Sequence, residues 1–353
     1  MKKILSLIMV AALVLNIGLT GCSSKTAEKP AAETPAAETP AAQAPAVEKQ
    51  TLKMSVTASD TSTWAKGAAK FAEIVAEKTN GQIEIKIYPN DQLSGGNQSK
   101  GIEMLMSGST DLTFHSNIIY SVMDERFGVV SLPFLIPDVE TADKIIDGAG
   151  GEALNKILLE KNIVGLGYGQ NGFRQLTNNV RPVVTPEDIA GMKIRIPGIK
   201  MFISLFKALG ADPITMNFGE VFTALQQNTI DGQENPLDTI ASSKINEVQK
   251  YMTVWNYSYD VIILGMNKDK FESFDPATQQ ILQDAAKEAC LYQRQITREL
   301  DAVHTKNFID GGVKVNELTP EQMGVFRDKV QSVYTEYEPI MGKELMDIFR
   351  QAK

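Results

Sequence analysis

The chain has 353 residues, of which 43% are hydrophobic and 22% are charged, and its formal net charge is −8. About 300 residues follow a low-complexity N-terminal stretch, which is enough to bury a large core and predicts two domains rather than one. The acidic balance, together with the lack of any basic tract interleaved with aromatic residues, argues against nucleic acid as a partner.

Residues 1–21 have the pattern of a secretory signal. Two lysines precede an apolar run that is too short to span a membrane comfortably, and the sequence LTGC that ends at Cys22 resembles the cleavage site of bacterial lipoproteins. An ordinary signal with an incidental cysteine is the alternative. We expect residues 1–21 to be removed and Cys22 to carry the lipid, which leaves a net charge of −10.

Residues 22–50 comprise this cysteine and an Ala/Pro/Thr/Glu-rich segment. Such a composition cannot bury a core, so the segment is predicted to be a solvated tether. The other cysteine of the chain, Cys290, lies in a helical pattern and is expected to be a small buried residue. The protein is thus predicted to be lipid-anchored outside the cytoplasm on a bacterial membrane, in the periplasm or at the cell surface.

Strand-like and helix-like patterns alternate from residue 51 onward. The strands show period-two apolar alternation, and the first helix ends at an Asn-Gly pair typical of a helix C-terminus. The expected order is a strand at 51–57, a helix at 63–81, a strand at 82–88, a helix at 95–108 and a strand at 111–116. This rhythm predicts an α/β fold with a largely parallel sheet.

Residues 167–172 (GYGQNG) have the glycine spacing of a dinucleotide-binding loop. Such a site requires a helix to begin there, so that its N-terminus can face the pyrophosphate. The sequence that follows instead has Asn-Asn and an early proline, with no helical apolar stripe. We therefore interpret these glycines as a flexible crossover and not as a nucleotide site.

Later helices have clear N-terminal signals. Residues 185–188 (TPED) and 319–322 (TPEQ) each place a capping Thr before Pro, with an acidic or amide side chain three residues on. Asp-Pro opens a sustained apolar stripe over residues 275–310. A helix of about 34 residues spans roughly 50 Å, so it is predicted to brace two domains.

Residues 191–198 (GMKIRIPG) read as a short strand between glycines. Ile194 and Ile196 alternate on one face, and Lys193 and Arg195 lie on the other. Alternation alone would leave Arg195 in solvent.

Residues 229–236 (TIDGQENP) read as a short strand, a glycine turn and three consecutive polar side chains. The end of a strand is where open α/β sheets place ligands, and an ordinary polar loop is the alternative.

Residues 181–237 resemble the signature region of the DctP-type substrate-binding proteins of TRAP (tripartite ATP-independent periplasmic) transporters. The matching motifs are TPED, the strand G-x-K-x-R-x-P, F-x-ALGA-x-P, E-x3-ALQ and DGQENP. Residues 87–114, 131–138, 247–259 and 264–274 also resemble segments of the family, so the similarity covers essentially all of 51–353. One departure is Asn228, where the family more often has Gly, although Asn tolerates left-handed backbone.

The resemblance implies a two-domain α/β fold of the periplasmic-binding-protein type, with an interdomain ligand cleft and a long bracing helix. Domain I would comprise residues 51–172 with 261–300, and domain II residues 173–260 with 301–353.

The resemblance also implies ligand contacts in the second domain. The family arginine that binds the ligand carboxylate is Arg195 here, and a planar guanidinium matches a carboxylate even when desolvated. Arg174 matches a second arginine that often contacts ligand, with an ion pair as its alternative role. Asn235 matches a position whose amide reaches the ligand.

Five other residues are candidates on weaker grounds. Trp64 is either a cleft wall or a core anchor of the first helix. His115 and Asn117 follow a strand end, where they are ligand contacts or parts of a capped turn. Trp255 and Tyr259 lie in a region that varies in the family, and either stack on the ligand or pack between domains.

The predicted function is that of a solute-binding lipoprotein which delivers a small organic anion to TRAP permease subunits. No zinc spacing, P-loop or nucleophile turn is present in the sequence, so we expect no cofactor, no metal and no catalysis. A membrane-anchored enzyme acting on a small acid, and a sensor component, are the alternatives. C4-dicarboxylates, 2-oxo acids, sugar acids, sialic acids and sulfonates remain open as ligands, and the hydrogen-bonding candidates favour a sugar acid.

Overall fold

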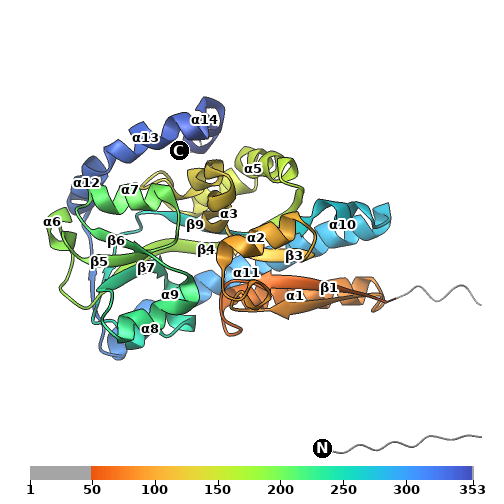
Figure 1. The fold of residues 1–353 in the computed structure, drawn as a ribbon, viewed down its shortest axis with the longest axis horizontal. Helices are drawn as coiled ribbons and strands as arrows, with labels where there is room; N and C mark the ends of the chain where they lie inside the picture. Colours follow the sequence, from red (N-terminus) through yellow and green to blue (C-terminus); the bar gives the residue numbers. More distant parts are fainter. Residues whose placement is uncertain (1–48, 352–353) are drawn as a thin grey trace, which may run out of the picture. The chain divides into compact units, whose positions relative to one another are not determined.

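The computed structural model describes residues 49–351, and the predicted signal, Cys22 and tether up to residue 48 lie outside the described residues (Figure 1). Within the described range, no helix has the length and apolar character needed to cross a membrane. The strands are β1 (Gln50–Val56), β2 (Ile83–Tyr88), β3 (Leu112–Ser116), β4 (Ile163–Asn178), β5 (Lys193–Ile196), β6 (Asp212–Thr215), β7 (Gly232–Pro236), β8 (Tyr251–Val254), β9 (Tyr259–Asn267) and β10 (Lys314–Glu317).

Helices connect and cover these strands. The α-helices are α1 (Thr63–Lys78), α2 (Gln98–Met106), α3 (Asn117–Met123), α4 (Val139–Ile146), α5 (Ala149–Glu160), α6 (Pro186–Ile189), α7 (Lys200–Ala208), α8 (Val221–Gln226), α9 (Leu237–Ser242), α10 (Lys268–Glu272), α11 (Pro276–Asp310), α12 (Pro320–Lys329), α13 (Gln331–Met341) and α14 (Lys343–Gln351). Short 3-10 turns are η1 (Gln92–Ser94), η2 (Glu125–Ser131), η3 (Phe218–Glu220) and η4 (Ile245–Glu247). The five elements predicted between residues 51 and 116 are confirmed as β1, α1, β2, α2 and β3.

The strands form one mixed sheet in the order β2-β1-β3-β9-β4-β7-β5-β6, with β8 pairing β4 and β10. The first half of the sheet (β1, β2 and β3) and the second half (β5, β6 and β7) are each internally parallel. Between them, β9 and β4 run antiparallel to each other and to β3 and β7. The expectation of a largely parallel sheet therefore holds within each half and is wrong for the strands that join them.

The glycines at 167–172 lie inside β4, so the predicted flexible crossover is wrong. β4 is a continuous strand of 16 residues with a bulge between Gln170 and Gly172. A Cβ on Gly169 would come within 2.6 Å of the Gln293 side-chain oxygen, and one on Gly167 within 3.0 Å of the Cys290 sulfur. The glycines thus allow α11 to pack directly on the strand.

The long helix forms as the sequence predicts. Asp275 caps α11 by accepting from the backbone N–H groups of Ala277 and Thr278, and Pro276 occupies the first turn. Along its 35 residues α11 contacts α1 and β4, and also α9 and β10. It therefore braces elements of both halves of the sheet, and Cys290 is buried on its inner face.

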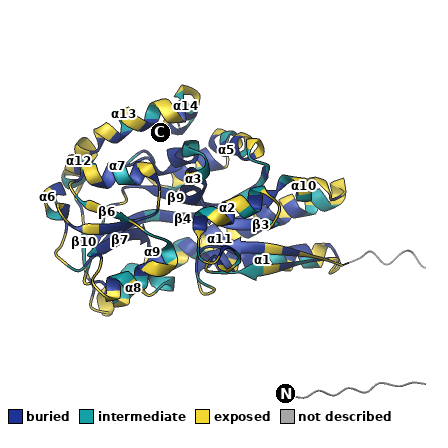
Figure 2. Cartoon of the chain, viewed as in Figure 1, coloured by how far each residue is buried: buried dark blue, intermediate teal, exposed yellow. Residues whose placement is uncertain are grey.

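Burial differs between the central strands and the outer helices. Every residue of β7 and β9 is buried, whereas exposed residues gather on the outer surfaces of α8, α10, α12 and α14 (Figure 2). The buried apolar residues of the described range form three clusters. The loop after β1 and the C-terminal ends of β3, β5 and β7 bring polar side chains from both halves to one place.

Candidate ligand-binding site

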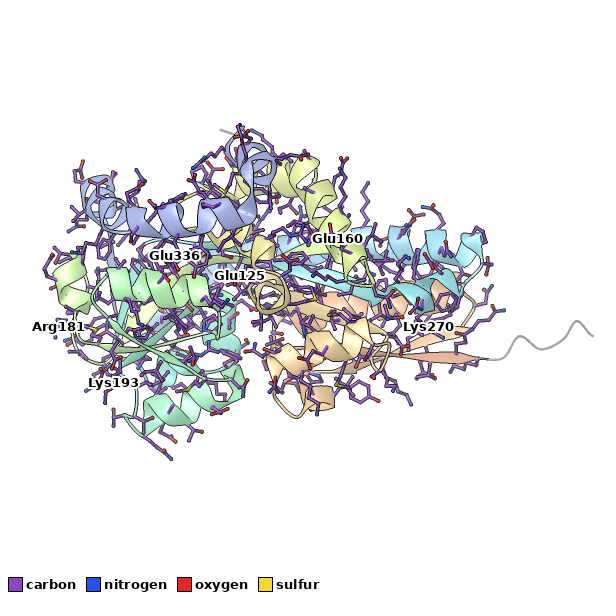
Figure 3. The ribbon with its side chains drawn as sticks, turned by 45° about the horizontal axis from the view of Figure 1, so that its top comes forward. Glu125, Glu160, Arg181, Lys193, Lys270 and Glu336 are labelled. Atoms are coloured by element: carbon purple, nitrogen blue, oxygen red, sulfur yellow. The ribbon has the colours of Figure 1, made fainter. Side chains whose placement is uncertain are left out.

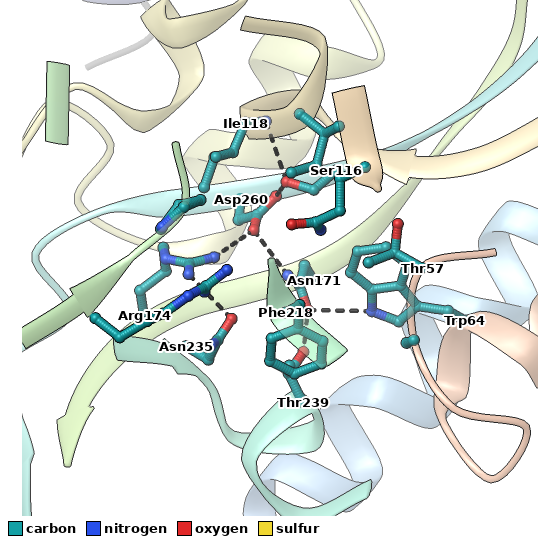
Figure 4. Close-up of a pocket in the computed structure, with 15 residues that line it drawn as sticks. Thr57, Trp64, Ser116, Ile118, Asn171, Arg174, Phe218, Asn235, Thr239 and Asp260 are labelled. Carbon is teal, nitrogen blue, oxygen red and sulfur yellow. Dashed lines mark hydrogen bonds and ion pairs between the residues drawn. The ribbon is translucent and has the colours of Figure 1, made fainter. Parts of the chain in front are cut away.

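A cavity lies where these strand ends meet (Figure 4). It contains about 390 Å³ of space not occupied by protein atoms, part of which is open to solvent. The lining residues come from both halves of the sheet: Thr57, Ala58, Trp64, Gln98, Ser116, Ile118, Ile119, Asn171, Arg174, Arg195, Pro197, Phe218, Asn235, Thr239 and Asp260.

Arg195 lies on the cavity wall, where β5 points it away from the apolar core. Its neighbours Ile194 and Ile196 are fully buried on the other face, and Arg195 itself is only 2% exposed. Its Nε and Nη2 atoms donate to the Met216 carbonyl oxygen at 3.2 and 2.8 Å. The ring of Phe218 lies 5.7 Å from its guanidinium carbon.

Among residues 49–351, no Asp or Glu oxygen lies within 4.0 Å of the Arg195 guanidinium. Burial lowers the pKa of Arg195 to about 10, so the group remains charged at neutral pH. A buried cation without a counterion is costly, and an anion in the cavity would relieve that cost. Lys193, on the same face of β5, is exposed at the edge of the molecule (Figure 3).

Arg174 also lines the cavity, but its charge is already paired. Its Nε and Nη2 atoms donate to the two carboxylate oxygens of Glu234, and Nη1 donates to Asp260 Oδ2 at 2.7 Å. Nη2 also donates to Asn235 Oδ1 at 3.0 Å. Burial opposes the charge on Arg174, but the two carboxylates outweigh it and raise its pKa. Arg174 thus lines the cavity and forms the ion pair that is its alternative role, and its contact with a ligand stays a prediction.

Asp260 lines the cavity near the start of β9. Its Oδ1 atom accepts from Ser116 Oγ at 2.5 Å, and its Oδ2 atom accepts from Asn171 Nδ2 at 2.7 Å as well as from Arg174. The residue is fully buried, and this burial raises the pKa of its carboxyl group. Asp260 therefore places a carboxylate, with three donors, directly at the cavity.

Trp64 is both a wall of the cavity and part of a hydrophobic core. It is 3% exposed and packs among the core residues of the first half of the sheet. Its indole Nε1 donates to Asn171 Oδ1 at 3.1 Å, and the hydroxyl of Thr239 donates to the same oxygen at 3.0 Å. Hydrogen bonds of Asn171 thus connect α1, α9 and Asp260 at the cavity.

Asn235 reaches the cavity from within β7, so the expected strand-turn-loop reading of TIDGQENP is wrong. Gln233, Glu234 and Asn235 form the strand itself, and α9 begins directly after Pro236. Asn235 Nδ2 donates to Gln233 Oε1 at 2.6 Å, while Glu234 accepts from the Tyr257 hydroxyl at 2.6 Å. Asn228, just before β7, has a left-handed φ of 55°, as its substitution for glycine suggested.

His115 and Asn117 flank a cavity residue, Ser116, but do not line the cavity themselves. His115 is fully buried with Nε2 at 3.3 Å from both Ser55 Oγ and Asp91 Oδ1. Asn117 donates to the Phe127 carbonyl and Ser131 Oγ, and accepts from the Val261 N–H. Their contact with a ligand stays a prediction.

Trp255 and Tyr259 also lie away from the cavity wall. Trp255 is 1% exposed and packs against the rings of Phe206, Tyr257 and Phe326. Tyr259 meets the ring of Phe173 edge-on at 4.9 Å. These contacts correspond to the packing role of the two alternatives, and stacking on a ligand stays a prediction.

Several cavity residues were not predicted: Thr57, Gln98, Ser116, Asn171, Phe218, Thr239 and Asp260. Asn171 lies in the glycine segment at 167–172, whose spacing is that of a nucleotide-binding loop. Asp260 directly follows Tyr259, and Ser116 lies between His115 and Asn117. At residues 115–117 the predicted strand end is therefore correct, and the side chain that lines the cavity, Ser116, lies one residue from the predicted ones.

Fold and cavity together define a two-lobed α/β binding protein, and comparisons with known proteins specify its family. The model of the DctP family, bacterial extracellular solute-binding protein family 7, matches residues 54–339. The chain therefore belongs to this family. The predicted resemblance to TRAP solute-binding proteins is confirmed.

Among its relatives, the chain is 34% identical over 266 residues to the 2,3-diketo-L-gulonate-binding periplasmic protein YiaO of Escherichia coli, covering 75% of this chain and 80% of YiaO. It superposes with a TM-score of 0.82 on the sugar acid binding protein DctPAm of Advenella mimigardefordensis in complex with galactonate, at 33% identity, covering 87% and 99% of the two chains.

A TRAP periplasmic solute-binding protein of Sulfurospirillum deleyianum with bound succinate gives a TM-score of 0.81 at 30% identity, covering 87% of this chain and all of that one. The relatives that match are solute-binding transport proteins, which fits the expectation that this chain is not an enzyme.

Proposed function

We propose that this protein captures a small organic acid in the cavity and delivers it to TRAP permease subunits. One observation carries the proposal: the buried guanidinium of Arg195 faces the cavity and has no carboxylate partner among residues 49–351. The relatives that bind diketogulonate, galactonate and succinate support a carboxylate as the ligand, with sugar acids favoured.

In this proposal Arg195 binds the carboxylate of the ligand through paired N–H groups. Asn235 and the paired Arg174 line the same cavity as Arg195, and Trp64 supplies an apolar wall. Hydroxyl groups of the ligand would meet Thr57, Gln98 and Thr239. Binding closes the halves of the molecule around the ligand, and the predicted boundaries near 172, 260 and 300 mark the hinge segments.

The test is a thermal-shift screen of carboxylates and sulfonates, followed by calorimetry of the strongest binder. A ligand present at about 100 times its Kd adds about 2.7 kcal/mol to the free energy of unfolding, which is a readily measured shift. Arg195→Ala should abolish this shift, while Lys193→Ala, on the same strand but exposed, should leave it intact. Equal affinity of Arg195→Ala and wild type would refute the assigned role.

The enzyme alternative predicts turnover, so prolonged incubation with the binder separates the two proposals. Recovery of the acid chemically unchanged supports a binding protein. Anchoring through Cys22 is a further part of the proposal, and Cys22→Ser should release the protein from the membrane fraction. Delivery requires that uptake of the acid into permease-containing vesicles depend on this protein.

A further inference from the structure

The cavity brings together two guanidinium groups and one carboxylate, with a second carboxylate directly behind them. Arg174, Arg195 and Asp260 are the ionisable side chains among the described lining residues, and Glu234 binds Arg174 from outside the cavity. Arg195, Glu234 and Asp260 are each at most 2% exposed, and Arg174 is 3% exposed. Charges buried to this extent are weakly screened, so their balance constrains what binds.

The two carboxylates are both directed at one arginine. Arg174 donates to Glu234 through Nε and Nη2, and to Asp260 through Nη1 at 2.7 Å. Asp260 receives two further hydrogen bonds, from Ser116 and Asn171. Arg174 is therefore not available to neutralise a ligand charge, and Arg195 is left as the one unpaired cation of the described cavity wall.

From this arrangement we infer that Asp260 is a specificity-determining residue which restricts the cavity to organic acids with a single negative charge. The inference rests on the proposed function and deepens it, because it chooses between monocarboxylates and dicarboxylates.

The physical reason is the energetic cost of burying a second ligand carboxylate in this cavity. The first would pair with Arg195, but the second would meet no unpaired cation on the described wall and would lie in the same small cavity as the Asp260 carboxylate. Burial of an unpaired charge is costly, and a like charge nearby adds to the cost. Neutral polar groups of a ligand meet hydroxyl and amide partners instead, at Thr57, Gln98, Ser116 and Thr239.

The test compares acids of matched shape that differ by one charge. Succinate is compared with succinamate, its monoamide, and galactarate with D-galactonate, by calorimetry at pH 7.5 on the wild-type protein. We expect the monoanion of at least one pair to bind about 10-fold or more tightly than its dianion.

Asp260→Asn is the matching variant, because an amide keeps the shape and can still accept from Arg174 and Asn171. It should narrow the preference for the monoanion by about 10-fold, while Glu336→Gln, an exposed carboxylate labelled in Figure 3, should leave the preference unchanged. If Asp260→Asn does not fold, the wild-type comparison decides by itself.

Equal or tighter binding of the dianion by the wild-type protein would overturn the inference and leave the proposed function standing. An unchanged preference in folded Asp260→Asn would overturn the role of Asp260. Lack of binding by all four acids would also overturn the inference. The broader screen of carboxylates and sulfonates would then show whether the proposed function fails as well.

Discussion

Asp238 accepts two hydrogen bonds from Thr63, one from the backbone N–H and one from the hydroxyl, and both are 3.0 Å long. Thr63 is the first residue of α1, which packs on β1 and β2 in the first half of the sheet. Asp238 lies in α9, which packs on β7 in the second half. A carboxylate from one half thus binds the N-terminus of a helix in the other, where the helix dipole favours negative charge.

This contact predicts a role for Asp238 in closing the protein over its ligand. Asp238 is 3% exposed and its side chain does not line the cavity. Asp238→Ala should nevertheless weaken binding by about 10-fold, because the closed form loses a charge-assisted contact and becomes less populated. Calorimetry with the acid identified by the screen measures the effect.

Two controls separate this effect from general damage. Asp238→Asn retains an acceptor for the Thr63 N–H and should weaken binding less than Asp238→Ala does. Asp231→Ala tests an acid of the same half that instead accepts from the Lys193 N–H. Wild-type affinity in a folded Asp238→Ala protein would show that the contact plays no part in closure.

Replacement of Arg195 by lysine tests whether shape matters in addition to charge. Lysine keeps the positive charge but loses the planar fork that can bind both carboxylate oxygens, and its ammonium is more strongly hydrated. We expect Arg195→Lys to bind about 10- to 100-fold more weakly than wild type, but more tightly than Arg195→Ala. A Kd for Arg195→Lys within about 2-fold of the wild-type value would argue that the site needs only a charge.

The sequence predicts regular elements well where one face is apolar. Ile83 and Ile85 of β2 are buried as their alternation indicates, and α11 begins and ends within a residue of its signals. β7 was misjudged because Gln233, Glu234 and Asn235 are all buried beside polar side chains of β4 such as Arg174. Prediction of a strand from alternating apolar residues assumes that its buried side chains are apolar. The buried side chains of β7 are polar next to the cavity, so the pattern does not reveal this strand.

Asp260 escaped prediction for a different reason. It lies 86 residues from Arg174 in the sequence, so no local spacing links the two charges. The aromatic cluster that includes Tyr259 favours that residue as a ligand contact, but successive residues of a strand such as Tyr259 and Asp260 point to opposite faces. Arg195 could be predicted only through the family resemblance, because alternation alone places it in solvent.

The glycines of β4 predict a stability effect independent of ligand binding. A Cβ on Gly169 would come within 2.6 Å of Gln293 Oε1 and 2.9 Å of the Phe114 ring. Gly169→Ala should therefore lower the free energy of unfolding by about 1–3 kcal/mol, because α11 must move from the strand. Gly324→Ala, where an added methyl meets nothing within 4 Å, is the control. Chemical denaturation measures the free energy of unfolding of both variants. Equal values for Gly169→Ala and Gly324→Ala would contradict the packing argument.

Asp301 of α11 predicts a dependence of stability on pH. Its Oδ1 atom is buried without a hydrogen-bond donor among the described residues. Burial and the nearby Asp238 carboxylate raise its pKa to about 7, and His304 offsets this in part. The folded protein therefore holds this proton more tightly than the unfolded chain does, since an unfolded Asp titrates near 3.9. The stability associated with the protonated form is fully present below that value and is lost as pH rises through 7.

Asp301→Asn removes this titration and keeps the shape of the protonated acid. As pH rises from 5 to 8, the free energy of unfolding of the variant should increase relative to that of wild type. The expected increase is about 1–2 kcal/mol, a figure that allows for the partial exposure of Asp301. Asp310→Asn, at the exposed end of the same helix, should show no such pH-dependent gain. Urea denaturation at the two pH values measures the difference for each variant. A constant offset between Asp301→Asn and wild type at pH 5 and pH 8 would mean that Asp301 titrates normally in the folded protein, so that its carboxylate reaches water.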